Sequence, residues 1–178
     1  MPSQIFIVPI NAIDRTLISR LTACLEERFI ASIAVGDRLD VPSGALNSQR
    51  QQMFMNSLVS RITRSAPSDD GLRLAITEYD LYKTGQRFVF SDADRQSGVA
   101  VVSMHRLRGE FYGEDADQDL LFQRTLKESV CGIGRAMGLK ACYDARCAMH
   151  HSSSVFETDN KMSHLCDQCD KRSRAERS

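Results

Sequence analysis

Apolar residues along the first three quarters of the chain alternate between short runs and helical spacing. Residues 4–10 form a β-branched and aromatic run, which predicts a strand, and a helix is expected from Asp14. A second helix should follow the turn-rich segment Pro42–Asn47, and a third should run from about Asp119 to Met137. The expected inner faces of these helices are Leu17, Ile18, Leu21, Leu25 and Phe29; Met53, Leu58, Val59 and Ile62; and Leu120, Leu121, Leu126, Val130 and Ile133.

The other strand candidates are short and are separated by turns or polar loops. They are Ile30–Val35, Leu72–Ile76, Arg87–Phe90 and Val99–Val102, with loops expected at Ser65–Gly71 and Glu110–Asp119. Strands interspersed with amphipathic helices predict an α+β domain, in which a mixed sheet packs against helices. This domain is expected to span residues 1–170, and residues 171–178 are expected to form a charged flexible tail.

The composition is that of an ordinary globular domain and gives no support to a nucleic-acid or membrane partner. The chain has 178 residues, of which 42% are hydrophobic and 26% charged, as in ordinary globular domains. Its 23 basic residues equal its 23 acidic residues, so charge gives no argument for nucleic acid or membrane binding. No apolar run approaches the ~20 residues that span a bilayer. The N-terminus lacks the features of a signal peptide, so a cytoplasmic location is expected.

Four of the six cysteines lie near the end of the chain, at metal-ligand spacing. Cys142 and Cys147 form C-x4-C, and Cys166 and Cys169 form C-x2-C. Zinc binds four thiolates tetrahedrally, and a shell filled by protein leaves no position for water, so one structural ion is expected. The loop between the pairs is poor in apolar residues, and metal binding would stabilise it. The alternatives are free buried cysteines or disulfides.

Other residues near the quartet have ordinary interpretations. Basic side chains there suit the −2 charge of a four-thiolate zinc centre but are individually expected to be solvated surface: Lys140, Arg146, Lys161 and Lys171. The histidines His150, His151 and His164 are expected at the surface, because four cysteines complete the shell. Cys24 and Met149 are expected to be core residues.

The pattern Gly138-Leu139, Cys142, Cys147-x-Met149 and Cys166-x-x-Cys169 resembles the archaemetzincins, which are zinc metallopeptidases of the metzincin type. Further similar landmarks lie upstream: Asn47, Arg50, Asp80-Leu81-Tyr82, Phe88-Val89-Phe90, Val101-Val102-Ser103, Arg106-Leu107 and Lys127-Glu128. The resemblance covers nearly the whole chain. It implies a single metzincin-like domain whose segment 138–170 is stapled by the four-cysteine zinc, with Met149 in the Met-turn.

Members of that family carry His-Glu-x-x-His-x-x-Gly-x-x-His-Cys, which supplies three zinc ligands and a general base. Aligned on Gly138 and Cys142, this sequence has Cys131, Gly132, Arg135 and Ala141 at the positions of the first His, the Glu, the second His and the third His. The resemblance therefore implies that none of the catalytic residues is present. Gly132 and Gly134 also predict a looser helix, since each lowers helix propensity by ~1 kcal/mol relative to Ala.

These observations favour an inactive archaemetzincin-like protein that binds a peptide or protein in the former active-site cleft. Arg135 would pair with a neighbouring acid or, alternatively, with a carboxylate of the ligand. One other interpretation is an active peptidase with unorthodox ligands such as Cys131 and His105. Another is a zinc-stapled module that binds nucleic acid or protein. The last is a cysteine hydrolase using Cys131, which would require a nearby histidine.

Overall fold

The fold is built on a five-stranded mixed sheet, with strand order β2-β1-β4-β8-β7. The computed structural model describes residues 4–65 and 71–175. The strands are β1 Gln4–Pro9, β2 Ser32–Val35, β4 Leu72–Thr77, β7 Ser91–Asp94 and β8 Val99–Ser103. All neighbours are parallel except β7, which runs antiparallel to β8 and forms one edge of the sheet. The predicted mixed sheet is therefore confirmed.

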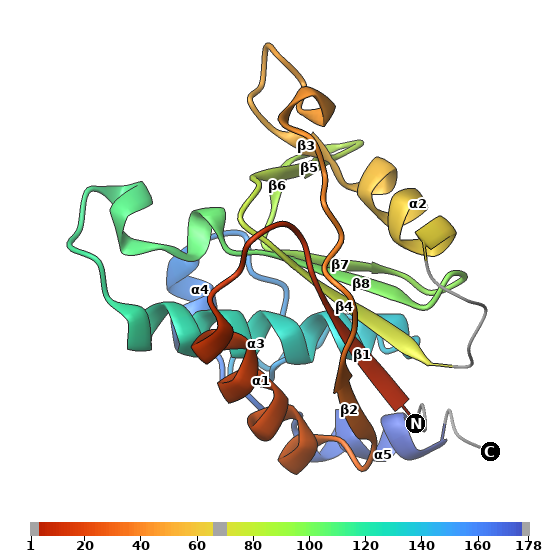
Figure 1. The fold of residues 1–178 in the computed structure, drawn as a ribbon. Helices are drawn as coiled ribbons and strands as arrows, with labels where there is room; N and C mark the ends of the chain where they lie inside the picture. Colours follow the sequence, from red (N-terminus) through yellow and green to blue (C-terminus); the bar gives the residue numbers. More distant parts are fainter. Residues whose placement is uncertain (1–3, 66–70, 176–178) are drawn as a thin grey trace.

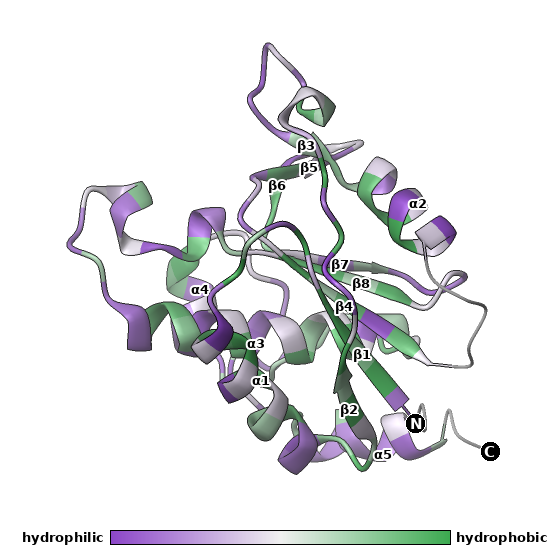
Figure 2. Ribbon diagram, in the orientation of Figure 1, coloured by the Kyte–Doolittle hydropathy of each residue, from purple (hydrophilic) through white to green (hydrophobic). Residues whose placement is uncertain are grey.

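Helices cover both faces of this sheet (Figure 1). Helices α1 (Arg15–Arg28) and α3 (Gln118–Ala136) contribute to the core on one face, whereas α2 (Met55–Ser65) packs on the other. Strands buried on both faces read as continuous apolar runs, and all five residues of β8 are buried. Figure 2 shows the resulting concentration of hydrophobic residues along the central strands.

A small second sheet packs beside α2, and its last strand leads into the edge strand β7 of the main sheet. Its order is β3-β5-β6, formed by β3 (Met53–Phe54), β5 (Leu81–Lys83) and β6 (Gln86–Val89). Only Phe90 separates β6 from β7, so the chain passes directly from the edge of one sheet to the edge of the other. Three short 3-10 helices lie in the connections, at Ser43–Ala45, His105–Leu107 and Gly109–Tyr112.

The structure corrects several expected element boundaries. Met53 is buried as expected, but it lies in β3 rather than in the second helix. The strand expected from Ile30 begins at Ser32, and Ile30 is largely exposed. Strands β5 and β7 were not predicted, because each is only three or four residues long and is partly polar. Most of the loop expected at Ser65–Gly71 lies outside the described residues.

The C-terminal segment packs against α3 through two further helices, α4 (Val155–Asn160) and α5 (Asp167–Ala175). The tail expected from residue 171 is wrong for residues 171–175, which continue α5 and include the buried Ser173. Within residues 4–65 and 71–175, no helix combines the length and apolar composition that crossing a bilayer requires.

The glycines of α3 are packing positions and do not interrupt the helix, contrary to the expected loosening. A Cβ atom at Gly134 would lie 2.3 Å from the Sδ atom of Met149, and one at Gly132 would lie 3.3 Å from the Cβ of Ala100 in β8. Met149 is completely buried as expected. The helix ends at Ala136, and Gly138 follows it with a φ of +98°, a left-handed conformation that strains any other residue. A Cβ atom there would also lie 2.6 Å from the Arg95 Cζ.

We expect Gly134→Val to destabilise the zinc-loaded protein by about 1–3 kcal/mol, because the added methyl groups must displace the buried Met149 side chain. Chemical unfolding measures the loss. In a Met149→Ala background the same substitution should cost clearly less. Gly44→Ala is the matched control, because a Cβ atom there meets nothing within 4 Å. An equal cost in both backgrounds would show that Gly134 does not receive Met149.

Candidate metal centre and adjoining cavity

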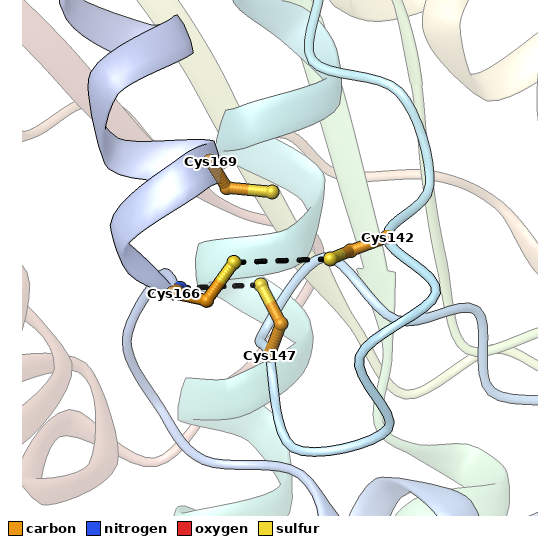
Figure 3. A group of neighbouring side chains, drawn as sticks. All are labelled: Cys142, Cys147, Cys166 and Cys169. Carbon is orange, nitrogen blue, oxygen red and sulfur yellow. Dashed lines mark hydrogen bonds between the residues drawn. The ribbon is translucent and has the colours of Figure 1, made fainter.

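The four C-terminal cysteines converge on one point (Figure 3). Their sulfur atoms all lie within 4.8 Å of one another, and the Sγ atoms of Cys142 and Cys166 are 3.8 Å apart. A tetrahedral zinc with Zn–S bonds of ~2.3 Å places its sulfurs about 3.8 Å apart. Four convergent sulfurs at this spacing, with two of them buried, fit a zinc ion, and the four cysteines are positioned to bind one.

Short local bonds hold the sulfur atoms in this arrangement. The Cys142 backbone N–H donates to the Met149 carbonyl at 3.0 Å, which closes the loop between the first two cysteines. The backbone N–H groups of Met149 and Cys166 both donate to the Cys147 Sγ, at 3.4 and 3.3 Å. Cys169 lies in the first turn of α5, whose N-terminal dipole favours negative charge. Burial nevertheless raises the pKa of the Cys147 thiol, to about 11, and that of Cys169, so the backbone bonds and the helix dipole only partly offset the burial, and binding of a metal would favour the thiolates.

The other residues near the quartet divide into surface and core. Among the described residues, the sulfur cluster recruits no histidine; His150 instead bonds the Cys142 carbonyl through Nδ1 at 3.0 Å. Four basic residues were expected to be solvated, and three of them are exposed: Lys140, Arg146 and Lys171. Lys161 contradicts the expectation, because it is only 1% exposed.

Lys161 pairs with Glu128 of α3, and this buried ion pair links the C-terminal segment to the helix. The Lys161 Nζ lies 2.8 Å from the Glu128 Oε1, which also accepts from the Thr158 hydroxyl at 2.9 Å. The other carboxylate oxygen accepts from the Ser91 hydroxyl on β7 at 2.5 Å. Burial alone would raise the pKa of Glu128, but Lys161 and these hydroxyl groups hold that pKa below its ordinary value. Glu128 is therefore an ionised, fully engaged carboxylate.

Cys131, which the resemblance places at the position of the first zinc-binding His, is completely buried. It packs in one apolar cluster with Leu139, Cys147, Met149 and Cys169. Burial raises the pKa of its thiol, although Lys161 and Arg135 oppose that shift. A protonated, enclosed thiol is neither a good nucleophile nor a good metal ligand.

Arg135, which the resemblance places at the position of the second His, extends from α3 to the edge strand β7. Its Nη1 donates to the Ser91 carbonyl at 2.9 Å and to the Asp92 carboxylate at 3.3 Å. Its Nη2 lies 3.4 Å from the His151 Nδ1. Burial would lower the pKa of Arg135, but nearby ionisable groups, Asp92 and Glu128 among them, raise it above its ordinary value. The expected pairing with a local acid is present, and Asp92 is that acid.

The other two positions that the resemblance aligns with catalytic residues, Gly132 and Ala141, offer no metal donor. Gly132 faces Ala100 of β8, and Ala141 is exposed. His105, considered as a distant partner of Cys131, is exposed and packs edge-on against Phe111 with ring centroids 5.4 Å apart. In the part of the chain that the structure describes, the four-cysteine quartet is the one group of three or more potential metal donors.

A cavity of about 170 Å³ lies beside Arg135. One wall is the chain from Gln86 to Ser91, which comprises β6 and the start of β7. The opposite wall consists of Glu128 and Arg135 on α3 with residues 151–153 from the loop between the cysteine pairs. Sequence reasoning did not single out Ser91, Asp92 or Ser152, because only the fold brings these separate polar residues to one place.

Comparison with known proteins gives consistent matches over nearly the whole chain. The family model described as Peptidase family M54 matches residues 19–174. Archaemetzincin from Thermococcus kodakarensis is 34% identical over 174 residues, which cover 94% of each chain. The crystal structure of archaemetzincin from Methanopyrus kandleri has a TM-score of 0.83 at 26% identity, covering 97% of this chain and 94% of that one. A zinc-dependent peptidase from Methanocorpusculum labreanum has a TM-score of 0.82 at 26% identity, covering 95% and 99%.

We expect Lys161→Met to destabilise the zinc-loaded protein by about 3–5 kcal/mol, because it leaves the Glu128 carboxylate buried without a counter-charge. Adding Glu128→Gln should recover much of that stability, since a neutral amide can still bond the Ser91 and Thr158 hydroxyls. Denaturant unfolding of the three variants measures both effects. Lys171→Met removes an exposed lysine and should change stability by less than about 0.5 kcal/mol. A double variant no more stable than Lys161→Met would contradict this interpretation of the pair.

Proposed function

Because the chain belongs to the archaemetzincins, a family of zinc-dependent peptidases, we propose that it is a member that binds peptides without cleaving them. In this proposal Cys142, Cys147, Cys166 and Cys169 hold one structural zinc, which stabilises the C-terminal segment and supplies no catalysis. A second, catalytic zinc is absent because its ligands are replaced. The observation that carries the proposal is the placement of Arg135.

A guanidinium at a metal-ligand position excludes a metal ion in two ways. It remains charged at any physiological pH and therefore repels a cation. Arg135 is also held in place by the Ser91 carbonyl and the Asp92 carboxylate, and its side chain is only 18% exposed. A zinc ion near Cys131 would have to displace this cation from its bonds. The charge on Arg135 thus takes the place of the charge on the metal.

The general base of the family has no substitute at the same place. Gly132 has no side chain to accept a proton. Glu128 is one helical turn away, but its two oxygens are occupied by Lys161, Thr158 and Ser91. An ionised carboxylate with a lowered pKa and three partners is a weak base for activating water.

Peptide binding remains compatible with this architecture because it requires an exposed strand edge and no metal. Strand β6 is the edge strand of the small sheet, and its residues form one wall of the cavity. An extended peptide would add to this edge through backbone hydrogen bonds, and the cavity would receive one of its side chains or its end. The net charge of zero gives no comparable support for a nucleic-acid partner.

The proposal predicts that zinc-saturated protein cleaves no peptide bond in a metal-dependent way. A mixture of quenched-fluorescence peptides, followed by mass spectrometry, measures cleavage before and after treatment with a chelator. A catalytic metallopeptidase assayed in parallel shows that the peptides are suitable. We expect the same background signal from the wild type and from a Cys131→Ala variant, because Cys131 ligates no metal.

The opposite result is equally clear. Cleavage that co-purifies with the wild type, is abolished by the chelator, returns with zinc and is lost in Cys131→Ala would establish an active site with unorthodox ligands. That outcome would overturn the inactive interpretation, whatever the protein binds.

A further inference from the structure

We propose that the cavity binds the C-terminal carboxylate of a peptide whose last residue is apolar, with Arg135 and the Ser152 hydroxyl as its receptors. This inference rests on the proposed function and specifies its ligand. The cavity would then bind the C-terminal end of a peptide and not an internal segment. The unused donors of Arg135, an unpartnered hydroxyl and the size of the cavity support it.

Arg135 has hydrogen-bond donors that its local bonds do not use. An arginine side chain has five N–H donors in a planar fork. Two N–H groups on Nη1 serve the Ser91 carbonyl and Asp92, and one on Nη2 faces His151. The Nε–H and the second Nη2–H have no partner among the described residues. A carboxylate is the anion whose shape matches such a pair of donors.

Ser152 provides an independent indication of a missing partner. Its Oγ is the one buried side-chain nitrogen or oxygen atom in residues 4–65 and 71–175 without a hydrogen-bond partner. Ser152 lies in the wall of the same cavity as Arg135. A buried hydroxyl without a partner is unfavourable, so a ligand oxygen that pairs with it after a small rotation is favoured.

The other charged groups around the cavity leave the Arg135 guanidinium able to bind an anion. Each carboxylate near the wall has a partner besides Arg135: Asp92, which Arg135 contacts at 3.3 Å, also pairs with Lys83, Glu128 pairs with Lys161, and Glu157 accepts from the Ser153 hydroxyl and backbone N–H. Arg87, also in the wall, makes no ion pair with a described residue. Burial and Arg135 lower the pKa of His151, so this imidazole is neutral and adds no charge.

The dimensions of the cavity favour a single terminal residue. A volume of about 170 Å³ is well below the ~300–1,000 Å³ of sites that enclose a whole small-molecule ligand. It is close to the ~150 Å³ of a cavity that holds benzene. Within the wall, Phe88 is partly exposed beside the buried Val89 and Phe90, and this apolar part of the lining suits a Leu- or Phe-sized side chain. The preceding residues of the peptide would then extend along the edge of β6.

Peptide binding measured by calorimetry on the zinc-loaded full chain tests the inference. The probe is an acetylated heptapeptide of small polar residues that ends in leucine, prepared with a free carboxylate and with a C-terminal amide. We expect the free acid to bind at least ten-fold more tightly than the amide, because a charge-assisted bidentate bond is lost with the amide. Binding of the two forms with equal affinity would overturn the carboxylate assignment.

Variants then assign the receptor groups. Arg135→Gln should weaken binding of the free acid roughly 10- to 100-fold and leave the amide unaffected. Ser152→Ala, which removes one oxygen and no packing of consequence, should weaken the free acid several-fold, so the test remains valid if Arg135→Gln fails to fold. Arg38→Gln is the matched control, because it removes one positive charge from a surface pair with Asp40 outside the cavity.

Two further outcomes separate this inference from the function on which it rests. An amidated heptapeptide ending in glutamate that binds as tightly as the free acid would replace the chain end by an acidic side chain and overturn the inference. Binding of all probes that is insensitive to both cavity variants would overturn it while leaving peptide binding intact. No binding of any probe, together with metal-dependent cleavage, would overturn the inference and the proposed function together.

Discussion

The attachment of a weakly apolar C-terminal segment to α3 is the constraint on which the site depends. Residues 138–170 supply few side chains to a core, yet they form one wall of the cavity. Three interactions hold the segment: the convergence of four sulfurs, the packing of Met149 against Gly134, and the buried pair between Lys161 and Glu128. Because residues 151–153 lie between the cysteine pairs, a metal on the quartet fixes the cavity wall without taking part in its chemistry.

On the proposed function, the same scaffold keeps its fold although the catalytic residues are replaced. A structural zinc and a catalytic zinc are distinguished by whether the protein fills every coordination position. The quartet fills all four; two of its cysteines, Cys147 and Cys169, pack in one cluster with Cys131, whereas Arg135 bonds the Ser91 carbonyl beside the cavity. On the proposed function, Arg135 brings a fixed positive charge and an ordered hydrogen-bond pattern to the position that the resemblance assigns to a metal ligand. A site of this kind is suited to holding an anion and not to polarising a carbonyl group.

The sequence predicted the features that depend on local spacing. The metal quartet follows from two short cysteine pairs, and the end of α3 just before Gly138 follows from apolar periodicity and the terminal glycine. Features that depend on distant partners were not predictable. Nothing near Lys161 shows that its partner is Glu128, thirty-three positions earlier in the chain, and the expectation of a solvated lysine was wrong. Strand β7 was missed because Ser-Asp-Ala-Asp has the composition of a loop, and the glycines of α3 were misread because their packing partners lie elsewhere in the chain.

The amount of zinc bound per chain tests the central claim most directly. Protein purified without added metal, and again after saturation with zinc and removal of the excess, would be measured by elemental analysis alongside a Cys166→Ser variant. The account predicts one zinc per chain in both wild-type samples, retained against a mild chelator, and its loss in the variant. Two zinc ions per chain, one of them released readily, would contradict the account, because a second metal site would then exist where Arg135 is held to exclude one.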